Sequence, residues 1–246
     1  MPNLPVPSLV RVYFADRGAE YTYYNDAFDL REGDIVYVEG KLEGVCGQVT
    51  GVNRNFRIRL SDYKRVVGRA ETAVRGAFSL AGDYLIAHDR KTLPYDRAIT
   101  WFKAPMKPGE VIAFGYDGAD FPLSEMERAF PPAAIERGEA YFLQNRVVYL
   151  ELDEHLVRAV VRGTRFYEVS FLLDGERVSI PACDCYVAGP CKHAYAALRA
   201  LRELLEHAPI CPDYFAAVEK GALLSYALSA NHSGEVVFNI SDSGPL

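Results

Sequence analysis

The sequence lacks the short signatures from which the common classes of enzyme are recognised. Its 246 residues contain no Gly-x4-Gly-Lys-Ser/Thr phosphate loop and no Gly-x-Ser-x-Gly nucleophile elbow. The run Asp153-Glu154-His155 has no phosphate loop to work with, so it indicates a turn rather than a nucleotide-hydrolysing site. We therefore expect a protein that is not an enzyme and has no small-molecule substrate.

Long apolar runs and secretory features are also missing. No stretch approaches the roughly 20 apolar residues that a membrane helix needs. The start, Met1 to Pro7, has neither the basic head nor the apolar core of a signal peptide. Cysteines are few, and three of the five lie between positions 183 and 191, which does not suit a disulfide scaffold. We expect a cytoplasmic protein without membrane contact.

Excess positive charge is absent as well. The formal net charge is −6, so the chain as a whole does not attract nucleic acid, and any such contact must come from a local basic segment. Half of the residues are hydrophobic and 24% are charged, which argues against disorder and supplies enough apolar side chains for a sizeable core.

Against this background, one stretch carries specific chemistry. Cys183, Cys185, Cys191 and His193 fall within eleven residues, and thiolates and imidazole are the ligands that tetrahedral zinc prefers. Residues two apart on an extended strand point to the same face, so both sulfurs of the first pair face one way. Gly189-Pro190 can then turn the chain back toward them. The pattern predicts a zinc ion held by these four residues.

The second ligand pair opens a predicted helix. Apolar residues recur at helical spacing from 194 onward, and the helix is expected to end near His207 because Pro209 cannot continue it. Strands are predicted over 146–150, 156–161, 166–172 and 177–180, with a hairpin turn at Asp174-Gly175. A β-meander thus leads to the first cysteine pair.

These features resemble the SWIM-type zinc finger: Cys-x-Cys, a short loop, and Cys-x-His opening an Ala/Leu-rich helix. The chain before it is similar too, and the resemblance covers roughly residues 131–206. The matching segments are Arg137 to Tyr141, Gln144 to Val147, Val160 to Thr164 and Tyr167 to Val169. Two departures are a loop of only five residues between the cysteine pairs and Asn145, which stands where such sequences often have glycine.

The resemblance implies a structural zinc and an interaction module. Four protein ligands leave the metal no free position for water, so the zinc does not act in catalysis. SWIM modules are interaction modules for DNA or protein, often joined to helicase-type factors. We expect an accessory protein that binds DNA or RNA, or one associated with a helicase or another protein partner. The alternative is a protein–protein adaptor that never contacts nucleic acid, which the acidic net charge favours.

The N-terminal third reads as β structure. Strands are predicted over 9–14, 21–24, 30–38, 44–52 and 56–60, separated by tight turns. Five short strands predict a small barrel, and the pattern Leu-x-x-Gly-Asp-x-Val-x-Val weakly resembles SH3-like or primosomal-type barrels. The fold class expected for the whole chain is α+β, with this barrel first and a meander plus helix second.

Cations gather near the end of the predicted barrel. Arg57 and Arg59 would share one strand face, with apolar residues on the other. Two interpretations stay open: an ordinary solvated face, or a strip that contacts phosphates. The candidate nucleic-acid-binding residues are Arg54, Arg57, Arg59, Lys64 and Arg65.

The expected domain organisation has four parts. Residues 1–75 form the barrel, 76–130 a connecting mixed α/β region, 131–208 the zinc-finger module, and 209–246 a C-terminal helix and strand. In the connecting region, strands are predicted at 84–87 and 111–114, a turn at 117–120 and a short helix over 124–130. Residues 213–229 are predicted to be helical and 235–240 to be a strand.

Overall fold

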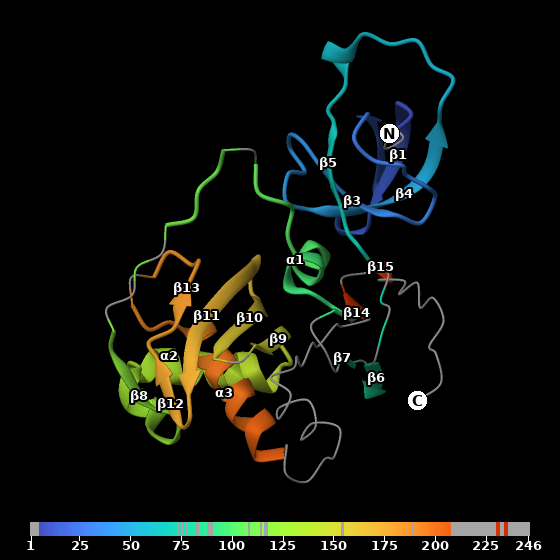
Figure 1. The fold of residues 1–246 in the computed structure, drawn as a ribbon. Helices are drawn as coiled ribbons and strands as arrows, with labels where there is room; N and C mark the ends of the chain where they lie inside the picture. Colours follow the sequence, from blue (N-terminus) through green and yellow to red (C-terminus); the bar gives the residue numbers. More distant parts are fainter. Residues whose placement is uncertain are drawn as a thin grey trace. The chain divides into compact units, whose positions relative to one another are not determined.

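The chain folds into two compact units, each described here by itself (Figure 1). The first comprises residues 1–74, 96–110 and 229–241, and the second comprises 75–95, 111–228 and 242–246. The computed structural model describes residues 5–72, 74, 76, 78–81, 84–87, 91–107, 109–113, 115, 118–153, 155–187, 189–207, 230–231 and 234–235. No helix among these residues is long and apolar enough to cross a membrane.

The first unit is built on a five-stranded antiparallel sheet. Its strands are β1 (Ser8–Phe14), β2 (Ala19–Asn25), β3 (Ile35–Val38), β4 (Cys46–Asn53) and β5 (Val66–Arg69), in the order β2-β1-β4-β3-β5. Val10, Val12 and Phe14 alternate along β1 and are fully buried. Gly47 lets β4 approach them, because a Cβ there would lie 2.5 Å from Val12 Cγ1. Alternation along the strands therefore builds the core, as the sequence indicates.

Two expectations for this unit are wrong. The sheet is not closed into a barrel, because the edge strands β2 and β5 are not paired; within residues 5–72 one isolated bridge joins Tyr24 of β2 to Arg65, just before β5. Residues 56–60 are not the fifth strand but a loop that ends in a 3-10 turn (Leu60–Asp62), and β5 takes that place. Phe56 packs edge-on against Tyr24, so the apolar alternation reflects loop packing without strand pairing.

Residues 96–110 complete the first unit. A short helix, α1 (Tyr95–Ala98), leads into a 3-10 turn (Ile99–Trp101). The indole Nε1 of Trp101 donates to the Glu71 carbonyl at 2.6 Å, and the hydroxyl of Tyr37 donates to the Thr100 carbonyl at 2.9 Å. These bonds fasten the segment to the chain around β3 and β5.

Short hairpins complete the elements outside the main sheets. β6 (Phe78–Ala81) pairs with β7 (Tyr84–Ala87), and β14 (Ala230–Asn231) pairs with β15 (Gly234–Glu235). Residues 111–113, expected as part of a strand, have no regular structure. The predicted helix over 213–229 lies outside the described residues, as does the predicted strand beyond residue 235.

The second unit contains the antiparallel meander that the sequence predicts. Its strands are β8 (Asp120–Pro122), β9 (Val147–Asp153), β10 (Leu156–Arg162), β11 (Phe166–Asp174), β12 (Arg177–Ser179) and β13 (Ala182–Cys183). The order is β8-β12-β11-β10-β9, and β13 also pairs with β11. The turn predicted at 117–120 is wrong at its end, since Asp120 begins β8, which pairs with β12 and was too short to be recognised in the sequence.

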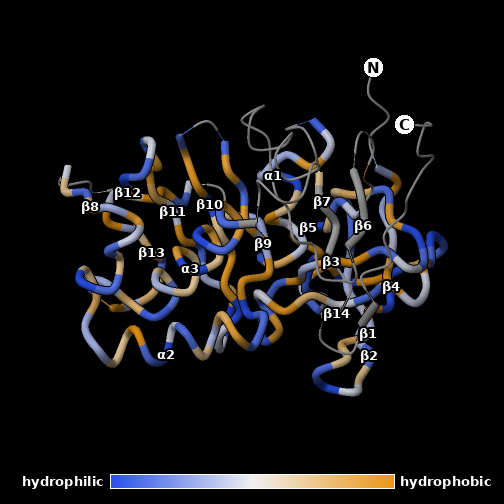
Figure 2. The backbone as a smooth tube through the Cα atoms, turned by 90° about the horizontal axis from the view of Figure 1, so that it is seen from below, coloured by the Kyte–Doolittle hydropathy of each residue, from blue (hydrophilic) through white to orange (hydrophobic). Residues whose placement is uncertain are grey.

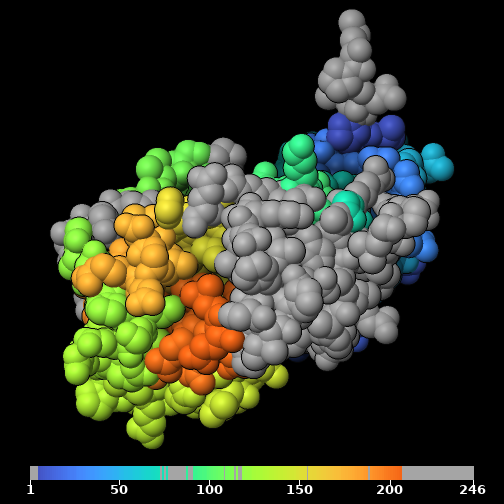
Figure 3. Space-filling model, turned by 60° about the horizontal axis from the view of Figure 1, so that its bottom comes forward, coloured from blue at the N-terminus to red at the C-terminus, as the bar shows by residue number. Residues whose placement is uncertain are grey.

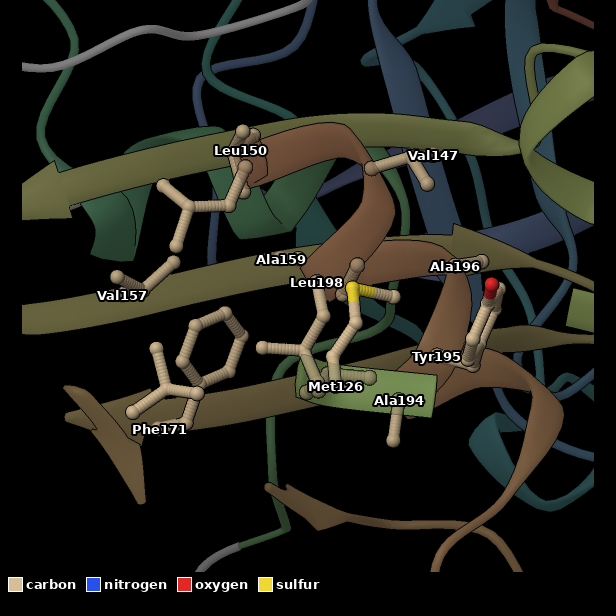
Figure 4. Close-up of a cluster of buried hydrophobic side chains, with 14 of the residues drawn as sticks. Met126, Val147, Leu150, Val157, Ala159, Phe171, Ala194, Tyr195, Ala196 and Leu198 are labelled. Atoms are coloured by element: carbon tan, nitrogen blue, oxygen red, sulfur yellow. The ribbon is translucent and has the colours of Figure 1, made fainter. Parts of the chain in front are cut away.

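Helices cover the inner face of this sheet. They are a 3-10 segment, η4 (Leu123–Ala129), α2 (Pro132–Leu143) and α3 (Lys192–His207). Leu198 of α3, Met126 of η4 and Phe171 of β11 are buried together in one cluster (Figure 4). Figure 2 shows the hydrophobic colour along β9, β10 and β11, as expected for a sheet whose inner face is the core. The α+β class is confirmed.

Helices α2 and α3 approach each other unusually closely. Gly138 of α2 is buried, and a Cβ on it would lie 2.7 Å from Cδ1 of Tyr195 and 2.9 Å from the Lys192 carbonyl oxygen. Small residues allow backbones to come together, and glycine here brings α2 against the first turn of α3. The first turn of α3, which carries the predicted ligand His193, is therefore positioned by its packing against α2.

Candidate metal centre

Strand β11 positions one side of the cysteine and histidine cluster. Val169 pairs with Cys183 across the β11–β13 ladder, and this register fixes the position of Cys183 along β11. The ladder continues through Asp184, whose backbone N–H donates to the Glu168 carbonyl at 3.1 Å while its carboxylate accepts the Glu168 N–H at 3.0 Å. The Val169–Cys183 pair and the two hydrogen bonds between Asp184 and Glu168 thus hold the Cys-x-Cys segment against β11.

The second ligand pair comes from the start of α3. Gly189 has φ 116°, a conformation that favours glycine, and it turns the chain back before Pro190. Cys191 is buried at the helix start, where its sulfur accepts the Ala194 N–H at 3.4 Å and its carbonyl accepts the Tyr195 N–H at 3.0 Å. The cysteine thereby caps a free helix N–H and is oriented toward the first pair.

The four ligand atoms converge as a tetrahedral metal requires. The three sulfurs and a ring nitrogen of His193 all lie within 4.8 Å of one another. Nδ1 of His193 is 3.8 Å from the sulfur of Cys183 and 3.9 Å from that of Cys191. Ligands about 2.3 Å from a tetrahedral zinc are themselves about 3.8 Å apart. The predicted set fits zinc in both identity and spacing.

Aromatic rings enclose the histidine ligand. Tyr167 stacks on His193 with ring centres 4.0 Å apart, and Tyr141 of α2 meets the same ring edge-on at 5.5 Å. Nε2 of His193 is buried and has no hydrogen-bond partner in the described structure. Gly163 makes room for this arrangement, because a Cβ there would be 2.8 Å from the Tyr167 ring. Ring packing, rather than a hydrogen bond to Nε2, sets the orientation of the imidazole.

Neighbouring groups drive the thiol pKa values apart. The hydrogen bond from the Cys183 thiol lowers the pKa of Cys191 to about 4, and bonds from His193 and the Ala194 N–H add to this. The hydrogen bond to Cys191, followed by burial, raises the pKa of Cys183. Zinc binds thiolates, so the cluster already favours one anionic ligand, and metal binding expels the protons of the others.

This donor set is typical of structural zinc sites. Three thiolates and an imidazole fill the four tetrahedral positions, so water has no place on the metal. A zinc bound by these residues would cross-link the Cys183–Cys185 segment to the start of α3. Cys183 and Cys185 are half-buried, whereas Cys191 and His193 are buried.

The candidate nucleic-acid-binding residues of the first unit all lie outside its strands, between the end of β4 and the start of β5. Arg54 lies 3.5 Å from Asp29, and Arg65 lies 2.5 Å from Asp26, so both are engaged in ion pairs. The strand face expected for Arg57 and Arg59 does not exist, because residues 54–59 are a loop; both side chains are exposed there, as is Lys64.

A second set of cations, which the sequence analysis missed, surrounds the metal centre. The guanidinium of Arg146 lies 4.5 Å and the ammonium of Lys192 5.0 Å from the centre of the Tyr141 ring. Arg165 lies 5.0 Å from the centre of Tyr167 and 5.6 Å from that of Tyr186. We call Arg146, Arg165 and Lys192 the zinc-end cations. They come from three separate segments, and only the fold brings them together.

The zinc-end cations differ from five arginines of their unit in having no acidic partner. No ion pair joins any of them to a carboxylate in the described part of the chain; Arg165 donates instead to the Asp184 carbonyl at 2.6 Å. Five other arginines of the unit are paired with acidic side chains, whereas Arg137 and Arg162 have no ion pair among the described residues. The pairs are Arg128–Glu125, Arg158–Glu151, Arg177–Asp120, Arg199–Glu139 and Arg202–Glu127. The zinc-end cations therefore place three positive charges without carboxylate partners near the zinc ligands.

The outer face of the sheet holds a separate polar network. Glu151 is buried and accepts from Arg158 at 3.0 Å, and burial raises the pKa of its carboxyl. Tyr95 donates to Glu168 at 2.6 Å and lies under the Arg158 guanidinium. The network fastens Tyr95 to β10 and β11.

Comparison with known families identifies the centre. The family model described as the SWIM zinc finger matches residues 167–202, from β11 to the middle of α3. Comparisons with curated proteins and with solved structures gave no significant match. The match covers all four ligand residues, so residues 167–202 of this zinc-binding chain form a SWIM zinc finger, whose Cys3His cluster is Cys183, Cys185, Cys191 and His193.

Proposed function

We propose that this protein is a non-catalytic accessory factor that binds nucleic acid through the zinc end of its second unit. The observation that supports this most is one of charge: the three zinc-end cations lie together over aromatic rings without a carboxylate partner, whereas five arginines of the same unit have one. Unpaired Arg and Lys side chains held in place suit phosphate contacts, which are the main source of affinity for nucleic acids.

The zinc contributes rigidity to this surface. Arg165 and Lys192 lie within two residues of Tyr167 and the ligand His193, so the metal that fixes His193 also fixes the base from which both cations extend. The ring face of Tyr141 contacts both Arg146 and Lys192. A positively charged surface that is ordered in advance loses less entropy on binding than flexible side chains do.

Two alternative functions involve protein partners instead of nucleic acid. A helicase or another protein partner could dock on the same end, and an adaptor without nucleic-acid contact agrees with the net charge of −6. An adaptor, however, gives no particular reason for three cations without carboxylate partners to gather over the rings of Tyr141 and Tyr167. We therefore place protein association second, and we propose no catalytic activity.

A pair of matched variants tests the proposal. Arg146→Gln/Lys192→Gln removes two positive charges at the zinc end, and Arg128→Gln/Arg177→Gln removes two charges that are paired with Glu125 and Asp120. Both proteins have the same net charge. Binding of a fluorescent single-stranded oligonucleotide is measured over a range of salt concentrations, using zinc-loaded full-length protein.

We expect wild-type affinity to fall steeply with salt, and the zinc-end variant to flatten this dependence by about 1.4 units of log K per log salt, since each single-strand phosphate contact contributes about 0.7. The matched variant keeps the wild-type slope. Equal slopes for both variants would show that the charge distribution is irrelevant, and absence of wild-type binding at low salt would support the adaptor.

A further inference from the structure

The loop between the two ligand pairs presents an unusual side chain. Tyr186 follows Cys185 directly and is 96% exposed, and its neighbour Val187 is 57% exposed. Large side chains of this kind are normally at least partly covered, and the described part of the second unit has no other tyrosine among its exposed large hydrophobic residues. Figure 3 shows the light orange segment around β13 at the surface, beside the darker orange α3.

The exposed ring is nevertheless held close to ordered groups. Arg165 lies 5.6 Å from its centre, and the same guanidinium is fixed by its hydrogen bond to the Asp184 carbonyl and by the Tyr167 ring beneath it. Tyr167 in turn stacks on the zinc ligand His193. The backbone beside Tyr186 is tied to the metal through Cys185. The ring is thus exposed but attached to a rigid support.

An exposed aromatic ring next to cations is the arrangement on which unpaired bases stack. Every base has a flat π face, and stacking on an aromatic side chain adds to phosphate contacts without requiring a particular sequence. In a duplex the base faces are covered by their neighbours, so the ring gains nothing there. Asp184 and Glu168 are the nearby acidic residues, and the Asp184 carboxylate is engaged by the Glu168 N–H.

From this we infer that Tyr186 is a stacking platform that makes the zinc end prefer single-stranded nucleic acid, with Arg165 supporting the stacked base. The inference rests on the proposed function and makes it more specific, since it names the class of nucleic acid and a residue that selects it. The zinc-end cations supply attraction to any phosphate backbone, and Tyr186 discriminates between open and paired strands.

The experiment compares an oligo-dT strand with a duplex of equal length, using zinc-loaded full-length protein. Tyr186→Ala removes the ring, Tyr186→Phe keeps it without the hydroxyl, and Tyr13→Ala serves as a control, because Tyr13 is an exposed tyrosine (40%) of the first unit. Zinc content and circular dichroism are measured for each variant. We expect Tyr186→Ala to bind oligo-dT about tenfold or more weakly, with its salt dependence and its duplex affinity unchanged.

The outcomes separate the inference from the function beneath it. Retention of oligo-dT affinity by Tyr186→Phe, and its loss by Tyr186→Ala alone, supports the inference. If wild type binds strand and duplex equally and Tyr186→Ala loses nothing, the stacking platform is wrong while the charge-based function stands. If wild type binds neither form at low salt, both are wrong, and the exposed ring belongs to a protein-binding surface.

Discussion

The five-stranded sheet of the first unit and the zinc end of the second hold their short strands by different means. In the sheet, Val10, Val12 and Phe14 of β1 are fully buried, so apolar side chains cover one another. At the zinc end, β13 has only two residues, and the loop after it leaves Tyr186 96% exposed. Hydrophobic packing fixes side chains by covering them, whereas a metal cross-link fixes a loop while leaving its side chains free to bind.

The two regions also treat their cations differently. In the sheet, most arginines pair with acidic side chains, as in Arg11–Glu20, Arg65–Asp26 and Arg69–Glu71. At the zinc end, Arg146, Arg165 and Lys192 lie over aromatic rings instead. We therefore propose that the metal supplies stability and that the side chains it leaves exposed supply binding, and each half of this proposal can be tested.

Loss of a zinc ligand gives the largest expected effect. Structural zinc contributes on the order of 10 kcal/mol in finger peptides, so Cys185→Ser, or chelation of the wild type, is expected to unfold the segment from β13 to the first turn of α3. Elemental analysis of wild type should give about one zinc per chain. Hydrogen exchange should show lost protection around residues 182–193 and retained protection in β1 and β4 of the first unit.

The control is another cysteine variant. Cys46 lies in β4 and is not a ligand, so Cys46→Ser should keep zinc content and exchange rates. The only tryptophan, Trp101, is buried in the first unit and reports on that unit alone. If chelation changes Trp101 fluorescence together with hydrogen exchange at residues 182–193, the two units do not unfold separately. The zinc would then not stabilise the second unit alone.

The second largest effect on stability is expected when a methyl group is added between α2 and α3. Gly138→Ala places a Cβ 2.7 Å from the Tyr195 ring and 2.9 Å from the Lys192 carbonyl oxygen, and that backbone cannot move aside easily. Overpacking of this kind costs roughly 1–3 kcal/mol. Denaturant unfolding followed by circular dichroism should show the loss in the second unit only.

A second glycine provides the comparison. Gly115 belongs to the same unit and has open space around its Cβ position, so Gly115→Ala should leave the unfolding midpoint nearly unchanged. Equal midpoints for the two alanine variants would mean that α2 and α3 shift apart without cost. Zinc affinity would then not depend on the way α2 supports the start of α3.

The sequence was sufficient for the features that depend on local pattern. The four ligands, the meander over β9 to β12 and helix α3 were predicted, because alternation, helical spacing and ligand spacing are local properties. Asn145 was noted where glycine is frequent, and it has φ 51°, the sole left-handed conformation among the described residues other than glycine. Asparagine tolerates this conformation better than most residues do.

Pairing and long-range contacts were not predictable in the same way. Phe56 and Ile58 alternate with arginines as a strand would, yet the hydrogen-bonded partner of β3 is β5, nearly ten residues later. Tyr141 and Tyr167 meet at His193 from positions that are far apart in the chain. Alternation of apolar and polar residues indicates which side chains are buried, but not which residues pack on them. The grouping of the zinc-end cations could therefore be recognised only in the fold.

The smallest effect is expected from the loop of the first unit. Arg57 and Arg59 are exposed and have no acidic partner in the described residues, so they remain available for weak phosphate contacts. They extend from a loop without strand pairing, so binding must first order them, and we expect Arg57→Gln/Arg59→Gln to flatten the salt dependence by less than one unit, below the 1.4 units of two full contacts. The matched variant, Arg11→Gln/Arg31→Gln, removes two exposed charges that have acidic neighbours, and should change nothing. A larger loss for the loop variant than for Arg146→Gln/Lys192→Gln would move the principal contact to the first unit, and the zinc end would then only support the chain.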